Sequence, residues 1–249
     1  MKAIYPDLKG RTVLVTGGAT GIGGAMSRAF AGQGARVGVL DIDADAGSVL
    51  AAELDDSACF FEVDLTDIDA TKGAVAEVAK ALGPITVLIN NAANDERHDL
   101  AEVTVAYWDA AMAVNLRHQF FCAQAVIPMM REAGGGSIVN FSSIAWMGGG
   151  TRMIAYSSAK AAVMGLTRSL ARELGVDGIR VNAIAPGAVI TERQRRLWMS
   201  DADIDAVVSR QCLHRVLHAE AIADTALFLA SDASAMITKQ CIVVDAGLR

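Results

Sequence analysis

The chain has 249 residues, of which 53% are hydrophobic and 20% are charged, a composition typical of compact globular proteins. A formal net charge of −6 disfavours binding to nucleic acid or to an anionic membrane surface. No apolar run reaches the roughly 18 residues of a membrane span, and the start shows no secretory signal. The four cysteines are too far apart to suggest a metal site or a disulfide framework. We therefore expect a cytoplasmic protein with one domain, residues 1–249, whose cysteines are reduced core thiols.

Short β-rich segments alternate along the chain with longer segments of helical periodicity. The predicted strands are residues 12–16, 36–40, 58–63, 85–90, 137–141, 178–184 and 241–244. Several of them are apolar at successive positions, which indicates that both faces of the sheet are covered. The sequence therefore predicts an α/β fold, a doubly wound parallel sheet of about seven strands with helices on both faces.

Helical periodicity is clearest at residues 24–34, 74–83 and 153–175, and a glycine ends each of these segments. Pro128 falls within another helical pattern, where it is expected to bend or loosen the helix. Residues 186–216 open with Pro-Gly and collect arginines around Trp198. We expect this stretch to be a mobile lid over the substrate.

The segment TGGATGIG, residues 16–23, directly follows the first predicted strand and precedes a helical pattern. Gly17, Gly21 and Gly23 allow a tight turn and a close approach of the backbone to a pyrophosphate at the helix N-terminus. Their spacing is GxxxGxG, whereas GxGxxG is the pattern most often quoted for this turn. A tight turn that binds nothing is the alternative.

Asp41 ends the second predicted strand, near the spacing at which a carboxylate meets the adenine ribose. It would accept hydrogen bonds from the ribose hydroxyls and repel a 2′-phosphate, and Thr20 stands where a phosphate site would offer a basic residue. These features favour NAD over NADP. Asp64, beside Leu65, is a candidate for the adenine edge, but it could equally be the N-cap of the next helix.

Tyr156 and Lys160 lie four residues apart in a predicted helix, so both side chains emerge from one face. A free tyrosine titrates at about 10 and is a poor base at neutral pH unless a nearby cation favours its phenolate. Lys160 would supply that cation. Ser143 follows the fifth strand and NNAA (90–93) the fourth, on the rim where open α/β folds bind ligands.

Together with PGAVIT (186–191) and the ending VVDAG, these motifs resemble the short-chain dehydrogenase/reductase family over nearly the whole chain. The resemblance implies a Rossmann-like NAD-binding fold, usually assembled as a homotetramer. It also implies that Tyr156 is the catalytic acid/base, that Ser143 orients the reacting oxygen, and that Asn115 holds a water linking Lys160 to solvent. Motif and resemblance together assign cofactor binding to Gly17, Thr20, Gly21, Ile22, Gly23, Asp41, Asp64, Leu65, Asn91, Ala92, Tyr156, Lys160, Pro186, Gly187, Val189 and Thr191.

Three positions depart from the family pattern. Ala93 replaces the usual glycine of NNAG, Lys239 replaces a common glycine before the last strand, and Ala246 replaces another near the end of the chain. The first departure would alter the fit of the cofactor, and the other two concern the packing of the C-terminal segment.

A narrower resemblance, carried by residues 94–100, 106–109, 114–126 and 143–146, is to bacterial aldose 1-dehydrogenases of the D-xylose type. It implies NAD-dependent oxidation of a pentose or a related sugar at C1 to the lactone. A sugar site needs polar groups and an apolar ring platform. The candidates for substrate binding are Asn94, Asp95, Ser143, Trp146, Arg152 and Tyr156. Trp146 could equally fill the core, and His98 and His118 are expected to be structural hydrogen-bonding groups.

Two alternatives stay open. The first is a dehydrogenase or reductase that acts on another alcohol or ketone, such as a sugar acid, a polyol or a 3-oxoacyl thioester. The second is a regulator that senses NAD without turnover, although such a protein could dispense with Tyr156 and Lys160. No metal site is expected.

Overall fold

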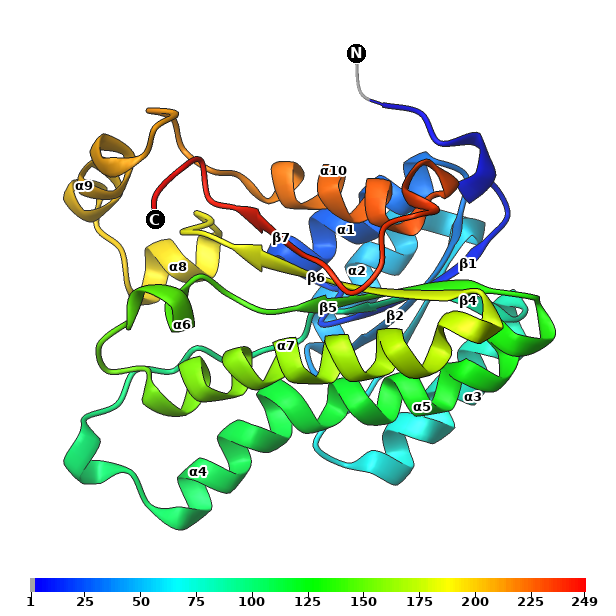
Figure 1. Ribbon diagram of the computed structural model, residues 1–249, viewed down its shortest axis with the longest axis horizontal. Helices are drawn as coiled ribbons and strands as arrows, with labels where there is room; N and C mark the ends of the chain where they lie inside the picture. Colours follow the sequence, from blue (N-terminus) through cyan, green and yellow to red (C-terminus); the bar gives the residue numbers. More distant parts are fainter. Residues whose placement is uncertain (1–2) are drawn as a thin grey trace.

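A computed structural model describes residues 3–249, which form one seven-stranded sheet in the order β3-β2-β1-β4-β5-β6-β7 (Figure 1). All neighbouring strands pair in parallel. The strands are β1 (Thr12–Thr16), β2 (Arg36–Asp41), β3 (Ala58–Glu62), β4 (Ile85–Asn90), β5 (Gly136–Phe141), β6 (Ile179–Pro186) and β7 (Cys241–Val244). The doubly wound α/β prediction is confirmed, with small differences at the strand ends.

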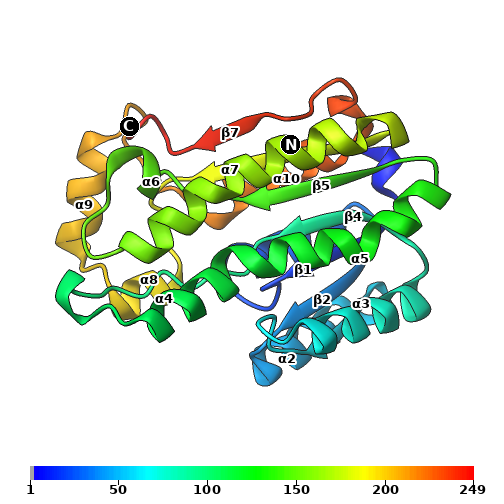
Figure 2. The ribbon, with the colours of Figure 1, turned by 60° about the horizontal axis from the view of Figure 1, so that its bottom comes forward.

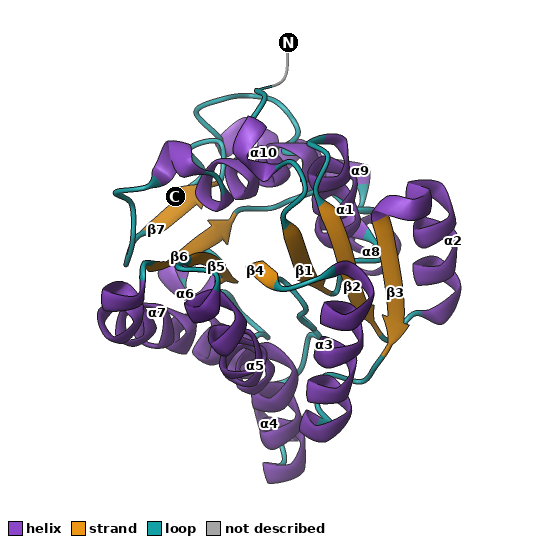
Figure 3. Ribbon diagram, turned by 90° about the vertical axis from the view of Figure 1, so that its right-hand side faces the viewer, coloured by secondary structure: helices purple, strands orange, loops and turns teal. Residues whose placement is uncertain are grey.

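Helices cover both faces of the sheet (Figure 3). They are α1 (Gly21–Gly32), α2 (Ala44–Leu54), α3 (Ile68–Leu82), α4 (Val105–Met112), α5 (His118–Glu132), α6 (Ala145–Gly148), α7 (Ile154–Leu174), α8 (Glu192–Leu197), α9 (Asp201–Arg210) and α10 (Ala219–Ala230). None of the helices within residues 3–249 is long and apolar enough to cross a membrane.

The apolar strands divide their side chains between two buried clusters, one on each face. In β1, Val13 and Val15 belong to the cluster that contains Met26 and Phe30 of α1. The intervening Leu14 belongs to the other cluster, which α3, α5 and α7 cover. Because successive side chains of a strand point to opposite faces, this double coverage explains why the predicted strands are apolar at successive positions.

Three local features bear on the sequence expectations. Helix α5 continues through Pro128, and the irregularity lies before it, in a π-helical turn at Ala113–Arg117. The expected lid, residues 186–216, carries two helices, α8 and α9. Cys212 is exposed on this segment, so the expectation of four core thiols is wrong for that residue.

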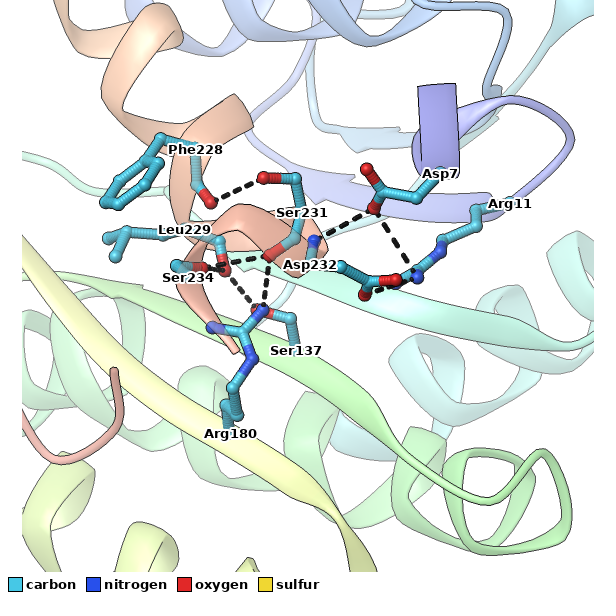
Figure 4. A network of polar contacts seen from close by, with 9 residues as sticks. All are labelled: Asp7, Arg11, Ser137, Arg180, Phe228, Leu229, Ser231, Asp232 and Ser234. Atoms are coloured by element: carbon cyan, nitrogen blue, oxygen red, sulfur yellow. Dashed lines mark hydrogen bonds and ion pairs between the residues drawn. The ribbon is translucent and has the colours of Figure 1, made fainter. Parts of the chain in front are cut away.

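A polar network fastens the N-terminal segment to the end of the sheet where the strands begin (Figure 4). The Arg11 guanidinium is 2.8 Å from Asp232 and 3.5 Å from Asp7. Arg180, near the start of β6, donates to the carbonyl oxygen of Ser231. At the opposite end, helices α4, α6, α8 and α9 gather beyond the C-terminal ends of the strands (Figure 2). That end contains the residues that the sequence assigned to chemistry.

Candidate active site

The turn between β1 and α1 has no room for side chains at two of its glycines. A Cβ at Gly17 would lie 2.8 Å from the Cα of Ala92, and one at Gly23 would lie 1.8 Å from the carbonyl oxygen of Gly17. Thr20 is the N-cap of α1, but its side chain makes no capping hydrogen bond. The first N–H groups of α1 are thus left for a ligand, and this cradle fits the pyrophosphate of a dinucleotide.

Asn91 holds the glycine turn against the end of β4. Its side-chain amide donates to the carbonyl oxygens of Thr16, at 3.1 Å, and of Gly17, at 2.9 Å. Its backbone N–H donates to the Thr16 hydroxyl at 3.0 Å. The NNAA motif therefore shapes the turn, with Ala92 directly beneath Gly17.

The Asp41 carboxylate lies at the end of β2 and is fixed on the same turn. It accepts from the backbone N–H of Ala19 at 2.9 Å and from that of Ile42 at 2.8 Å. Asp64 accepts from the N–H and the hydroxyl of Thr66. It does not cap the next helix, because the N-cap of α3 is Asp67, so the helix-cap alternative for Asp64 is wrong.

Ser143, Tyr156 and Lys160 come together at the C-terminal rim. The Lys160 ammonium lies 5.6 Å from the centroid of the Tyr156 ring and donates to the carbonyl oxygen of Phe141 at 2.8 Å. The Ser143 hydroxyl lies close enough to Tyr156 to lower its pKa. The adjacent Ser142 donates to the carbonyl oxygen of Lys160 at 2.7 Å, which ties α7 to the end of β5.

Burial dominates the protonation of this group in the protein alone. It raises the pKa of Tyr156 to about 12, although the Ser143 side chain opposes the rise. It lowers the pKa of Lys160 to about 7, with the Asp95 charge acting in the other direction. Burial, with the Lys160 charge, lowers the pKa of His118 to about 3, so this histidine is neutral. The sequence predicted that Lys160 lowers the tyrosine pKa, but in the protein alone desolvation sets the direction and the pKa is raised.

Asn115 lies in the π-helical turn between α4 and α5, where it holds the loop that follows β4. Its side-chain oxygen accepts from the N–H of Asn94 at 2.9 Å, and its amide nitrogen donates to the carbonyl oxygen of Asn94 at 3.0 Å. The nitrogen also donates to the carbonyl oxygen of Ala111. These bonds engage both the oxygen and the nitrogen of the Asn115 side chain. They fix the backbone of the loop after β4 beside the catalytic rim.

The candidate substrate residues Asn94 and Asp95 contact helix α8, the first helix of the lid segment. The Arg193 guanidinium pairs with the Asp95 carboxylate and donates to the side-chain oxygen of Asn94 at 3.0 Å. Gln194 donates to the other Asp95 oxygen at 2.7 Å. We call these contacts the Asp95 clasp. Burial raises the pKa of Asp95, but the bonds from Arg193 and Gln194 outweigh it and hold the pKa below its ordinary value.

The remaining substrate candidates lie around the same rim. Trp146 in α6 is 36% exposed, so the alternative of a core-filling aromatic is wrong, and its indole N–H donates to Ser142. Arg152 forms an ion pair with Asp99 at 3.0 Å. His98 is buried and shares a 2.8 Å hydrogen bond with the Tyr107 hydroxyl, which is the structural role expected of it.

The lid segment approaches the glycine turn where α8 begins. A Cβ at Gly21 would meet the Thr191 side chain at 3.5 Å, and Thr191 is the N-cap of α8. Val189 is buried and forms an isolated β-bridge with Leu217. A Cβ at Gly187 would clash with Asp245. Sequence reasoning noticed the arginines around Trp198 but gave none of them a role, because contacts between the lid and the loop after β4 leave no local pattern.

Two of the three departures from the family pattern have left-handed backbone conformations. Lys239 has φ of 66° and Ala246 has φ of 56°, a region in which glycine is unstrained and other residues are not. The glycine pattern at these two positions thus has a conformational reason, and this chain retains the conformation without the glycines.

A family model described as enoyl-(acyl carrier protein) reductase matches residues 17–249. The chain belongs to the short-chain dehydrogenase/reductase family. It is 50% identical over 248 residues to a probable galactose dehydrogenase of Rhizobium meliloti, covering 98% of this chain and 97% of that protein. It is 46% identical over 250 residues to a D-xylose 1-dehydrogenase of Caulobacter vibrioides, covering 99% of each.

A solved structure agrees with this assignment. The crystal structure of a putative short-chain alcohol dehydrogenase from Sinorhizobium meliloti matches with a TM-score of 0.92 and 34% identity, over 98% of both chains. The expected family is therefore confirmed. The protein is an oxidoreductase that acts on CH–OH groups with a nicotinamide cofactor, as the family and the dehydrogenase relatives indicate.

Proposed function

We propose that this enzyme oxidises an aldose, a pentose or a related sugar, at C1 to the lactone with NAD. The observation that carries the proposal is the convergence of Ser143, Tyr156 and Lys160 in a chain similar to two sugar dehydrogenases. The Ser143 and Tyr156 hydroxyls are paired groups that can hold and deprotonate one sugar hydroxyl.

Bound NAD would supply the hydride acceptor and a positively charged nicotinamide ring. Ser143 holds the C1 oxygen, and ionised Tyr156 takes the proton of the C1 hydroxyl as the C1 hydrogen leaves with its electron pair. Because burial raises the tyrosine pKa, ionisation depends on added positive charge and on Lys160. Asn115 would hold a water that links Lys160 to solvent.

The choice of NAD over NADP is supported by the Asp41 carboxylate, which accepts from the backbone N–H of Ala19 in the glycine turn and from that of its neighbour Ile42. A 2′-phosphate would meet this charge directly. Ile22 and Leu65 would line the same region. Thr20, Asp64, Pro186, Gly187, Val189 and Thr191 complete the proposed cofactor site, with Asn91 and Ala92 beneath it.

Asn94, Asp95, Trp146 and Arg152 would surround the sugar, with residues 186–216 as the lid of a single domain. We further propose a homotetramer without nucleic-acid or membrane partners. Four free cysteines favour a reducing compartment, and the cytoplasm is the proposed location.

The decisive experiment measures NADH and NADPH formation across pentoses, hexoses, 6-deoxy sugars, polyols, sugar acids and 3-hydroxyacyl thioesters. We expect aldoses with NAD to give the highest kcat/KM and the product to be the lactone, identified by NMR before it hydrolyses. Preference for a polyol, a sugar acid or a thioester would overturn the proposal. Tight NAD binding with no turnover of any compound would favour a regulator.

A further inference from the structure

Three arginines belong to segments that frame the substrate candidates, and two of them are paired with carboxylates. Arg193 pairs with Asp95 and Arg152 with Asp99. The third, Arg97, follows β4 in the same loop as Asp95. No hydrogen bond or ion pair joins its side chain to another group within residues 3–249. Of these three arginines, Arg97 is the one whose donors have no acceptor within residues 3–249.

Arg97 lies against the lid segment. Its guanidinium carbon is 5.4 Å from the centroid of the Trp198 ring, just beyond the end of α8. The Nε of Arg97 and the indole N–H of Trp198 are both enclosed, and neither has an acceptor within residues 3–249. Enclosed donors without acceptors are costly, so a ligand that brings oxygen atoms would stabilise the closed arrangement.

The charged side chains of this region shift the pKa of the catalytic Tyr156. The groups that face Tyr156 are Ser143 beyond β5, Lys160 on α7, Asp95 and Arg97 after β4, and Arg193 on α8. Asp95 and Arg193 form an ion pair and largely cancel one another. Arg97 therefore adds positive charge near the site without an internal counter-ion.

We propose that Arg97, stacked on Trp198, binds oxygen atoms of the aldose at the end of the sugar away from C1. The inference rests on the proposed function, which places C1 at Tyr156. A guanidinium has five N–H donors and no acceptor, which suits hydroxyl and ring oxygens. Because Trp198 belongs to the lid segment, the same contact links substrate binding to closure of the lid.

The test combines variants of the protein with truncated sugars. Arg97→Met should raise KM for the preferred aldose by about tenfold to hundredfold, the loss expected for a hydrogen bond to a charged group. The kcat should change less than the KM, because C1 is held elsewhere, and any fall in kcat should shrink as the pH is raised, because loss of the Arg97 charge raises the pKa of Tyr156. Arg97→Lys, which keeps the charge without the planar fork, should recover part of the loss.

Deoxy sugars separate direct contact from a structural role. A sugar that lacks the contacted hydroxyl should already have a high KM with the wild type, and Arg97→Met should add less than about twofold to it. Arg195→Met is the matched control. Arg195 is an arginine of the lid helix α8, but it pairs with the exposed carboxylate of Asp201. This variant should keep the wild-type KM.

The possible outcomes distinguish failure of the Arg97 proposal from failure of the proposed function. An equal KM increase for every deoxy sugar, or an unchanged KM for the preferred aldose, would overturn the role of Arg97 while leaving aldose oxidation intact. A wild type that oxidises no aldose but turns over another alcohol would instead refute the proposed function. NAD binding, measured by isothermal titration, should be the same in all variants and confirms that each is folded.

Discussion

The Asp95 clasp gives a quantitative test of how the lid is held. Arg193→Met removes the guanidinium but keeps an apolar stem, and it leaves the Asp95 carboxylate with Gln194 as its remaining side-chain donor. The Asp95 side chain is 15% exposed and that of Arg193 is 42% exposed, so the pair lies between a surface bridge and a buried one. Surface pairs contribute about 0–1 kcal/mol, and breaking a buried pair costs about 3–5 kcal/mol.

We therefore expect the Asp95–Arg193 pair to stabilise the closed lid by about 1–2 kcal/mol. If substrate binds only to the closed form, Arg193→Met should lower kcat/KM by about 5- to 30-fold. Hydrogen exchange of the amides in residues 191–198 should accelerate by a similar factor, because exchange reports local opening. The pKa of Asp95 should rise, because the carboxylate loses both the hydrogen bond and the positive charge of Arg193.

A double-mutant cycle with Asp95→Asn isolates the pair from its neighbours. The effects of the two single variants should not add, and the coupling should equal about 1–2 kcal/mol. Additivity within about 0.5 kcal/mol would refute the idea that the pair holds the lid. Arg195→Met removes an exposed bridge to Asp201 and controls for general loss of charge.

Further predictions address the cofactor site, the catalytic group and the backbone. Gly23→Ala should abolish NAD binding in isothermal titration while circular dichroism stays native-like, because its Cβ would lie 1.8 Å from the Gly17 carbonyl oxygen. Tyr156→Phe should abolish turnover and leave NAD binding intact. In the wild type, kcat/KM for oxidation should rise from pH 6 to pH 9, since the high pKa of Tyr156 leaves little phenolate at neutral pH, and a flat profile would argue against it as the base. Ala246→Gly should raise the free energy of unfolding by about 0.5–1 kcal/mol, since it relieves a left-handed alanine, whereas Ala76→Gly in α3 should lower it by a similar amount.

Features that depend on local pattern could be predicted from the sequence. The strands are apolar at successive positions because both faces are covered, and the glycine turn follows β1 directly. Tyr156 and Lys160 are one helical turn apart, so their shared face follows from helix geometry alone. Their pKa values could not be predicted in the same way, because desolvation depends on what α7 packs against.

The contacts that the sequence did not predict join residues distant in the chain. Asp95 and Arg193 are 98 positions apart, and Arg97 meets Trp198 only because the segment after β6 returns over the end of β4. The π-helical turn that holds Asn115 also has no simple periodicity. Arginines near a tryptophan are common on protein surfaces, and only the fold shows that Arg97 lies against the Trp198 ring with an enclosed Nε that has no acceptor within residues 3–249.

One residue joins the catalytic rim to the lid segment. The backbone of Asn94 is held by Asn115 through two hydrogen bonds, and its side chain accepts from Arg193 on α8. The backbone bonds do not involve α8, so opening of the lid releases the Asn94 side chain without releasing its backbone. Changes in the Asp95 clasp should therefore alter KM and lid exchange, whereas Asn115→Ala should loosen the loop after β4 even with the lid closed. Faster exchange at the Asn94 amide in Arg193→Met, equal to that in Asn115→Ala, would contradict this separation.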